Sequence, residues 1–210
     1  YATGIESNSA RDPSFNLADL LAAIKPNFQT LLLPYSTASD GNEALIGEIE
    51  EACARLHRHA KPLPIDAINE TLVKTAGLIT HFDTIMYLEG DAIAIYGAGL
   101  GKLASQRSVT MFAGTIDGVR NAAISYVADP AHLADAAFRA AKEVLINKKD
   151  PRKLSVIKAP TPCHLMFNTK LWEKQGLANM NIPDVIRRIR SDSRFKSIHE
   201  NILVDGAPYE

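Results

Sequence analysis

The sequence has little cysteine, no long uncharged apolar run and almost no net charge. Two cysteines among 210 residues exclude a disulfide scaffold. The longest uncharged stretch of the most apolar region, between Asp91 and Lys102, has ten residues, whereas a membrane-spanning helix needs about 20. A net charge of −1 argues against a protein that binds polyanions over its whole surface. The 46% apolar content predicts a soluble globular chain that needs neither disulfide nor metal to fold.

The sequence also lacks targeting and redox motifs. The first residue is Tyr1 and not methionine, and no charged segment followed by an apolar one comes after it, so we expect a processed or truncated N-terminus. Cys53 and Cys163 stand far apart, which excludes a CxxC redox or zinc motif and favours two small buried apolar side chains. Two unpaired thiols favour a reducing compartment, and nothing else indicates the compartment.

Apolar residues recur at intervals of three and four along much of the chain, and this spacing predicts amphipathic helices. The expected long helices cover residues 42–60, 64–89, 108–127 and 130–147. Asp129 followed by Pro130 is typical of a helix start, because aspartate caps the first turn and proline lacks an N–H that would need a partner there. The links are short, which predicts antiparallel neighbours. The expected fold class is mainly α, an antiparallel up-and-down helical bundle.

The two ends differ in composition from the middle. Residues 1–16 are rich in small and polar residues and predict an extended arm. Residues 17–147 would form the bundle, with a short first helix that Pro26 ends. Residues 28–33 fit a strand and a helix equally well. Prolines divide residues 148–210 into short elements, which predicts a C-terminal module packed on or next to the bundle.

Charge divides at the same boundary. Residues 1–147 hold 11 Lys and Arg against 17 Asp and Glu, a net −6, and residues 148–210 hold 12 against 7, a net +5. Such a bipolar chain suggests contacts with partners of opposite charge.

Three glycines precede a lysine in one short motif: Gly97, Gly99, Gly101 and Lys102. Glycines directly after an apolar segment resemble the turn of a dinucleotide-binding unit, where a pyrophosphate approaches a helix N-terminus. The spacing is Gly-x-Gly-x-Gly instead of Gly-x-Gly-x-x-Gly, and no further βα units are expected after it. The motif is therefore a candidate nucleotide or phosphate site, with a flexible corner between two helices as the competing interpretation.

No constellation of catalytic side chains stands out. The sequence contains no Gly-x-Ser-x-Gly elbow and no Glu-x-x-His pair, which are typical of serine hydrolases and di-iron bundles. Histidines two residues from another ligand, such as His57 and His59, lie on different faces of a helix and chelate poorly. These absences favour a protein without catalytic activity, metal or cofactor.

Charged side chains gather in two clusters that could bind a partner. The basic cluster holds Arg187, Arg188, Arg190, Arg194 and Lys196. The acidic cluster holds Glu48, Glu50 and Glu51. Solvated helix faces are the favoured interpretation of both clusters. If they bind, an acidic protein surface suits the arginines better than a nucleic-acid backbone.

The bundle, the arm and the divided charge favour one function above others. The prediction is a non-catalytic structural or assembly subunit, coat-like or accessory, of a homo- or hetero-oligomer with protein partners. One alternative is an enzyme or binding module that holds a nucleotide or phosphate at Gly97–Lys102. A second alternative is a bundle that binds an apolar ligand in its interior.

Overall fold

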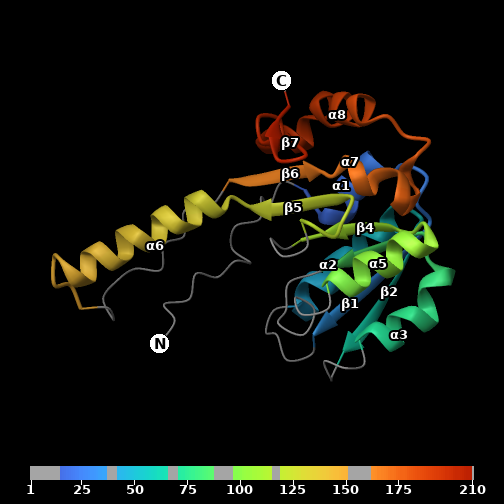
Figure 1. The fold of residues 1–210 in the computed structure, drawn as a ribbon, viewed down its shortest axis with the longest axis horizontal. Helices are drawn as coiled ribbons and strands as arrows, with labels where there is room; N and C mark the ends of the chain where they lie inside the picture. The colour runs from blue at the N-terminus through green and yellow to red at the C-terminus, as the bar shows by residue number, and fades with distance from the viewer. Residues whose placement is uncertain are drawn as a thin grey trace.

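The chain folds around one mixed sheet with helices on both faces (Figure 1). The computed structural model describes residues 15–36, 42–65, 71–87, 97–114, 119–150 and 162–209. The strands of this part of the chain are β1 (Thr30–Ser36), β2 (His59–Ile65), β3 (Thr84–Tyr87), β4 (Thr110–Ala113), β5 (Ile124–Ala128), β6 (Cys163–Phe167), β7 (Ile202–Val204) and β8 (Ala207–Pro208). The α-helices are α1 (Leu17–Ile24), α2 (Asn42–Arg55), α3 (Thr71–Leu78), α5 (Gly97–Arg107), α6 (Pro130–Leu145), α7 (Thr169–Trp172) and α8 (Ile182–Ser191), with shorter turns η3 (Ile79–His81), η6 (Glu173–Leu177) and η7 (Ser193–Ile198).

The strand order is β2-β1-β3-β4-β5-β6-β7-β8. Strands β1 to β5 are parallel to their neighbours, β6 runs antiparallel to β5, β7 is parallel to β6, and β8 is antiparallel to β7. The chain adds β2 on one side of β1 and then crosses to add β3 on the other side. A parallel sheet with such a reversal is doubly wound, and its helices lie on opposite faces on the two sides of the reversal.

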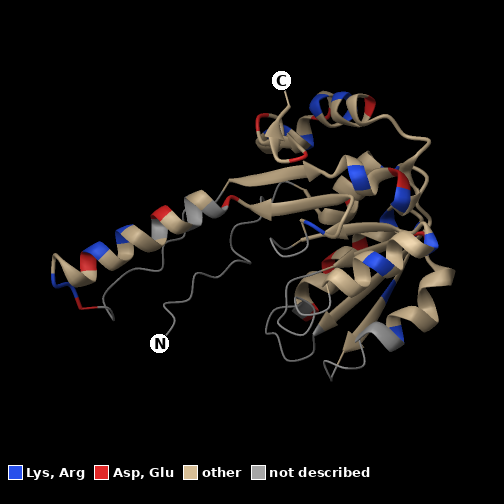
Figure 2. Cartoon of the chain, in the orientation of Figure 1, with Lys and Arg blue, Asp and Glu red and all other residues tan. Residues whose placement is uncertain are grey.

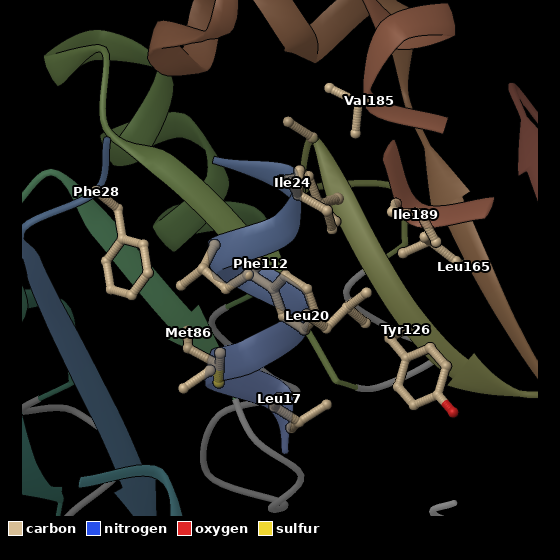
Figure 3. Packing of buried hydrophobic residues seen from close by; sticks show 14 of the residues in the cluster. Leu17, Leu20, Ile24, Phe28, Met86, Phe112, Tyr126, Leu165, Val185 and Ile189 are labelled. Carbon is tan, nitrogen blue, oxygen red and sulfur yellow. The ribbon is translucent and has the colours of Figure 1, made fainter. Parts of the chain in front are cut away.

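The helices bury the two faces of the sheet in separate apolar clusters. On one face, α1, α2 and α8 pack over the strands, and Figure 3 shows Leu20 and Ile24 of α1 beside Phe112 of β4. Val185 and Ile189 of α8 belong to the same cluster. On the other face, α3 and α5 cover the opposite sides of the same strands with two smaller clusters. Parallel strands buried on both faces are rich in apolar residues without alternation, and β3 and β4 are buried at every position.

The helical-bundle prediction is wrong, because the chain is an α/β protein. Residues 42–60 hold α2 and the start of β2, residues 64–89 hold α3, η3 and β3, and residues 108–127 hold β4 and most of β5. Short runs of buried apolar residues have the same appearance in a buried strand and in a buried helix turn. The three-four spacing therefore extends over several short helices and strands and does not belong to single long helices.

Proline at 62 and 64 misled the prediction in a second way. Both residues lie inside β2, where the prediction has one helix stop and the next begin. Strand β2 is the first in the sheet order, and an edge strand tolerates proline because one row of its N–H groups needs no ladder partner. Residues 28–33, left open between strand and helix, supply the start of β1.

Two helices are where the sequence predicts them. The predicted short helix at residue 17 is α1, and the predicted helix at 130–147 is α6, with Asp129 as its cap. On and directly after α6, the apolar side chains of Phe138, Leu145 and Ile146 are 66% to 76% exposed. Figure 1 shows α6 running away from the sheet.

The predicted boundaries between the arm, the bundle region and the C-terminal module stay predictions. Residues 1–14 lie outside the described part of the chain. Strands β6 to β8 of the C-terminal part continue the sheet of β1 to β5. None of the helices in the described ranges is long and apolar enough to cross a membrane.

Candidate functional site

The reversal of strand order lies between β1 and β3. In open parallel sheets a crevice forms at such a reversal, outside the carboxyl ends of the strands, because the flanking helices lie on opposite faces there. Strand β3 ends at Tyr87, and the helix that returns from it, α5, begins at Gly97. This carboxyl edge is the candidate site.

Three residues from distant segments meet at the first turn of α5. A Cβ atom placed on Gly97 would lie 3.1 Å from Tyr87 Oη and 3.5 Å from Asn121 Nδ2. Tyr87 is fully buried, and its carbonyl accepts a 2.8 Å hydrogen bond from Gly114 N at the end of β4. Glycine at position 97 therefore keeps the first turn of the helix close to the tyrosine hydroxyl and the asparagine amide.

Gln175 fixes the turn that carries Asn121. Its side chain is fully buried, and Nε2 donates to Asn121 O at 2.9 Å while Oε1 accepts from Ala123 N at 2.8 Å. Oε1 also lies 3.3 Å from Met111 N in β4. Because both polar atoms of the buried Gln175 amide form hydrogen bonds, this side chain fixes the position of the Asn121 turn relative to the sheet.

The conformation that presents Gln175 depends on the next residue. Gly176 has φ +79°, and a Cβ placed there would lie 2.3 Å from Ser108 O. Only glycine permits both the left-handed backbone and the close approach to the end of α5. A lone Gln-Gly pair follows no known site motif, so sequence reasoning missed it.

The predicted glycine motif lies in the helix and not in a turn. Gly97, Gly99, Gly101 and Lys102 all belong to the first turns of α5. Gly97 lies at the carboxyl edge. Gly101 packs against the Asn121 turn, since a Cβ there would lie 2.6 Å from Asn121 O, while Lys102 is exposed. Binding of a nucleotide or phosphate by these four residues stays a prediction.

A buried lysine lies at the opposite end of the strands. Lys25 Nζ donates to Asp83 O at 2.8 Å, to Thr110 Oγ1 at 3.1 Å and to Thr84 Oγ1 at 3.3 Å, and lies 3.4 Å from Asp83 Oδ1. Burial lowers the pKa of this ammonium, and the Asp83 carboxylate partly offsets the effect. The other carboxylate oxygen of Asp83 accepts from the backbone N–H of Gln29 and of Thr30. The hydrogen bonds of Lys25 and Asp83 connect the starts of β1, β3 and β4, and they stabilise the fold.

The predicted basic cluster lies on and after α8, where Figure 2 shows several Lys and Arg side by side. Three of its arginines are held within the chain. Arg188 donates to Ala23 O at 2.9 Å, Arg190 to Tyr209 O at 2.8 Å, and Arg194 to Asp192 Oδ2 at 2.7 Å. Arg187 pairs with Asp184 on the surface, and Lys196 is exposed. A protein or nucleic-acid partner for this cluster stays a prediction.

The predicted acidic cluster lies on α2, on the same face of the sheet as α8. Glu48 and Glu51 are exposed and Glu50 is half-buried. Between the two helices, Asp19 of α1 is 8% exposed, accepts a 2.9 Å hydrogen bond from Arg55 and lies 3.5 Å from Arg194 Nη1. The structure does not bring the two predicted clusters into contact through any ion pair among the described residues.

Both cysteines are buried, as predicted. Burial raises the pKa of Cys53 to about 11, and the carboxylates of Asp19 and Glu50 add to the effect. A thiol of this kind is a poor nucleophile at neutral pH. The described residues contain no cluster of three His, Cys, Asp or Glu that could hold a metal ion.

No protein-family model matches the chain, and no curated protein matches it. Solved structures do match. A conserved domain protein from Vibrio cholerae O1 biovar El Tor aligns with a TM-score of 0.70 and 19% identity over 81% of this chain and 56% of its own length. An ABC domain in complex with L-Trp from Streptococcus pneumoniae has a TM-score of 0.67 and 18% identity over 76% of this chain and 54% of its own.

A third similar structure is the ligand-free, open form of a substrate-binding protein with adhesive properties from Clostridium difficile. It has a TM-score of 0.58 and 16% identity over 80% of this chain and 59% of its own. The chain thus spans between half and two thirds of the length of the structures that it matches. At these identities the likeness establishes a shared α/β fold.

The comparisons overturn the predicted assembly subunit. That prediction was based on a helical bundle with a separate basic module, and the chain instead has the sheet found in the L-Trp complex and in the substrate-binding protein. The predicted alternative of a binding module agrees better with this fold than the assembly subunit does.

Proposed function

We propose that this chain is a small-molecule-binding module that holds its ligand at the carboxyl edge of the sheet, between β1 and β3. The observation that carries the proposal is the reversal of strand order at that place, with the first turn of α5 opening on it. Ligands of doubly wound proteins bind at such reversals because the crevice there is part of the backbone topology. Two of the similar structures are described as an L-Trp complex and a substrate-binding protein, which supports the same class.

The chemistry of the edge favours an anionic group on the ligand. The first N–H groups of a helix have no partner within it, and the helix dipole places partial positive charge at the same point. Gly97 brings this turn close to the Tyr87 hydroxyl and the Asn121 amide, which add two polar side chains beside those donors. A small organic solute with a carboxylate or phosphate meets these conditions.

Isothermal titration of the purified chain tests the proposal. The compounds are L-tryptophan, the other free amino acids, inorganic phosphate and ADP, each titrated into the same preparation. At least one should bind with a stoichiometry near one. A chain that binds none of them contradicts the proposal.

The position of the site is tested with a matched pair of glycine variants. Gly97→Leu should abolish binding, because the side chain would occupy the space beside Tyr87 and Asn121. Gly77→Leu is the control, since a Cβ at Gly77 has no neighbour within 4 Å. Binding by Gly97→Leu as tight as by the parent chain would mean that the ligand lies elsewhere.

A further inference from the structure

A pocket of about 430 Å³ lies beside β5 and β6, next to the turn that carries Asn121. Its lining includes Arg120, Ser125, Met166, Asn168, Lys170 and Asp205. Pockets that bind small organic molecules have volumes of roughly 300–1,000 Å³. The pocket is therefore large enough for a ligand of metabolite size.

The pocket exists because one face of β5 and β6 has no helix over it in the described part of the chain. Ser125 and Met166 pair across the two strands, so both side chains lie on the same face. Their neighbours in sequence, Ile124 and Phe167, point to the opposite face and belong to the main core cluster. On the pocket side, α5 packs over residues of β3 and β4. The pocket lies beyond it, beside Ser125 and Met166.

The charges of the lining favour an anion with one negative charge. Arg120 and Lys170 are exposed at the rim, and Asp205 is the one carboxylate among the lining residues. Asp205 accepts hydrogen bonds from Thr169 N at 2.9 Å and Thr169 Oγ1 at 2.5 Å, so both of its oxygens are committed. The remaining charge of about +1 balances a carboxylate, whereas a phosphate monoester carries about −1.5 to −2 at pH 7.

The lining of the pocket also favours an apolar body. Met166 is half-buried and lies beside Ala122 and Val119 in the lining. The thioether side chain of methionine adapts to flat and aromatic groups at little cost. We infer that this pocket binds a small amphipathic carboxylate, with the carboxylate at Arg120 and Lys170 and the apolar part on Met166.

Methyl-labelled methionine provides a local readout. The chain has four methionines, and Met86 and Met111 are buried in other clusters while Met180 packs against the main core. The probe is 3-phenyllactate, which has a carboxylate, a hydroxyl and an aromatic body. In a titration to about 10 mM, the Met166 methyl resonance, assigned with Met166→Leu, should shift saturably while the other three stay in place. The absence of a saturable Met166 shift contradicts the inference.

Two controls separate the chemistry from adventitious binding. The neutral 3-phenyllactamide should bind at least about tenfold more weakly, because it lacks the charge that Arg120 and Lys170 would meet. The double variant Arg120→Gln with Lys170→Gln should lose about tenfold in affinity for 3-phenyllactate, and Lys174→Gln, an exposed lysine outside the lining, should lose none. Equal binding of the amide, or an unchanged double variant, overturns the inference.

The experiment is independent of the proposed function. A parent chain that binds none of the compounds in the isothermal titration but gives the saturable Met166 shift removes the proposed function alone. The reverse result removes only the pocket.

Discussion

Helices α1 and α6 begin with the same kind of local signal and end in opposite environments. Asn16 Oδ1 accepts from Ala18 N at 2.9 Å, and Asp129 Oδ1 accepts from Ala131 N at 2.9 Å. Helix α1 is half as long, yet six of its eight residues are buried under the sheet. Helix α6 exposes Phe138, Leu145 and Ile146. A cap and an apolar spacing thus determine where a helix starts, whereas the surrounding sheet determines whether it is buried.

The contrast between α1 and α6 indicates that the sheet and its packed helices contribute most of the stability and that α6 contributes little. In the sheet and its helices, each side chain is fixed by neighbours from distant segments, and removal of one leaves a cavity. Along α6, side chains meet water and a few neighbours on the same helix, such as the Arg139 and Asp135 pair at 2.6 Å. Exposed pairs of this kind contribute about 0.3–0.5 kcal/mol. Matched substitutions in the two regions should therefore have very different effects.

The largest difference is expected for phenylalanine. Phe112 is fully buried in β4 and Phe138 on α6 is 68% exposed. Phe112→Ala should lower the free energy of unfolding by about 3–5 kcal/mol, and Phe138→Ala should change it by less than about 0.5 kcal/mol. Urea unfolding followed by circular dichroism measures both. A comparable loss in both variants would show that α6 is packed in solution.

Lysine gives the next largest effect. Lys25→Met removes the donor for Asp83, Thr84 and Thr110 and should cost about 2–3 kcal/mol, because the acceptors left behind are buried or partly buried. Lys142→Met on α6 is the control, since this lysine is exposed. Chemical denaturation at pH 7 measures the two variants. A Lys25→Met chain as stable as the parent would mean that burial of the charge costs as much as its hydrogen bonds return.

Two glycine-to-alanine substitutions compare a crowded and an open position in helices that pack on the sheet. Gly101→Ala places a Cβ 2.6 Å from Asn121 O, and because Gln175 holds that turn, we expect a loss of about 1–2 kcal/mol. Gly77→Ala in α3 has nothing within 4 Å of the new Cβ and should raise stability by about 0.5–1 kcal/mol through helix propensity. Thermal unfolding of the two variants should move in opposite directions. Two shifts of the same sign contradict the proposed packing at Gly101.

Removal of the two N-cap side chains should affect global stability in α1 but only local opening in α6. Asn16→Ala should lower global stability by about 1 kcal/mol, because α1 opens only with the core. Asp129→Ala removes a similar bond from α6 but should leave the global value nearly unchanged. Amide hydrogen exchange should instead accelerate by about fivefold along α6, as expected for the same 1 kcal/mol lost in a local opening. A global loss in Asp129→Ala would place α6 within the cooperative unit.

The smallest effect concerns pH. Hydrogen bonds from the Thr169 side chain and backbone hold the pKa of Asp205 below its usual range. Because the folded-state pKa is lowered, the contact stabilises the chain above the unfolded pKa of about 3.9 and is lost as the pH falls through the lower folded value. The Thr169 amide resonance should follow that titration. Thr169→Val should move the pKa of Asp205 back toward its usual range, and an unchanged midpoint would contradict the assignment.

Only part of this structure could be predicted from the sequence. The starts of α1 and α6 depend on residues next to each other, Asn16 and Asp129 with the positions that follow. Strand β3 depends on parallel neighbours from residues 30–36 and 110–113, so its four buried residues look like one turn of a helix when read alone.

The candidate site was predictable to a similar extent. Gly97 stood in a motif, whereas Tyr87, Asn121 and Gln175 come from three segments with no motif between them. The fold brings them to the first turn of α5 through hydrogen bonds that link residues more than fifty positions apart. A local sequence motif cannot predict contacts between residues so far apart in the sequence.

The meeting of β5 and β6 has a use in protein engineering. Ala128 pairs with Cys163, and Asp129 N donates to Pro162 O at 2.8 Å, so the chain leaves the sheet and returns to it at neighbouring points. Foreign domains are accepted best where the two attachment points lie close together and carry few contacts of the host. Replacement of residues 130–161 by a reporter domain with adjacent termini would keep every strand in register. A fluorescent protein grafted there would be joined to the rest of the chain through two adjacent strands.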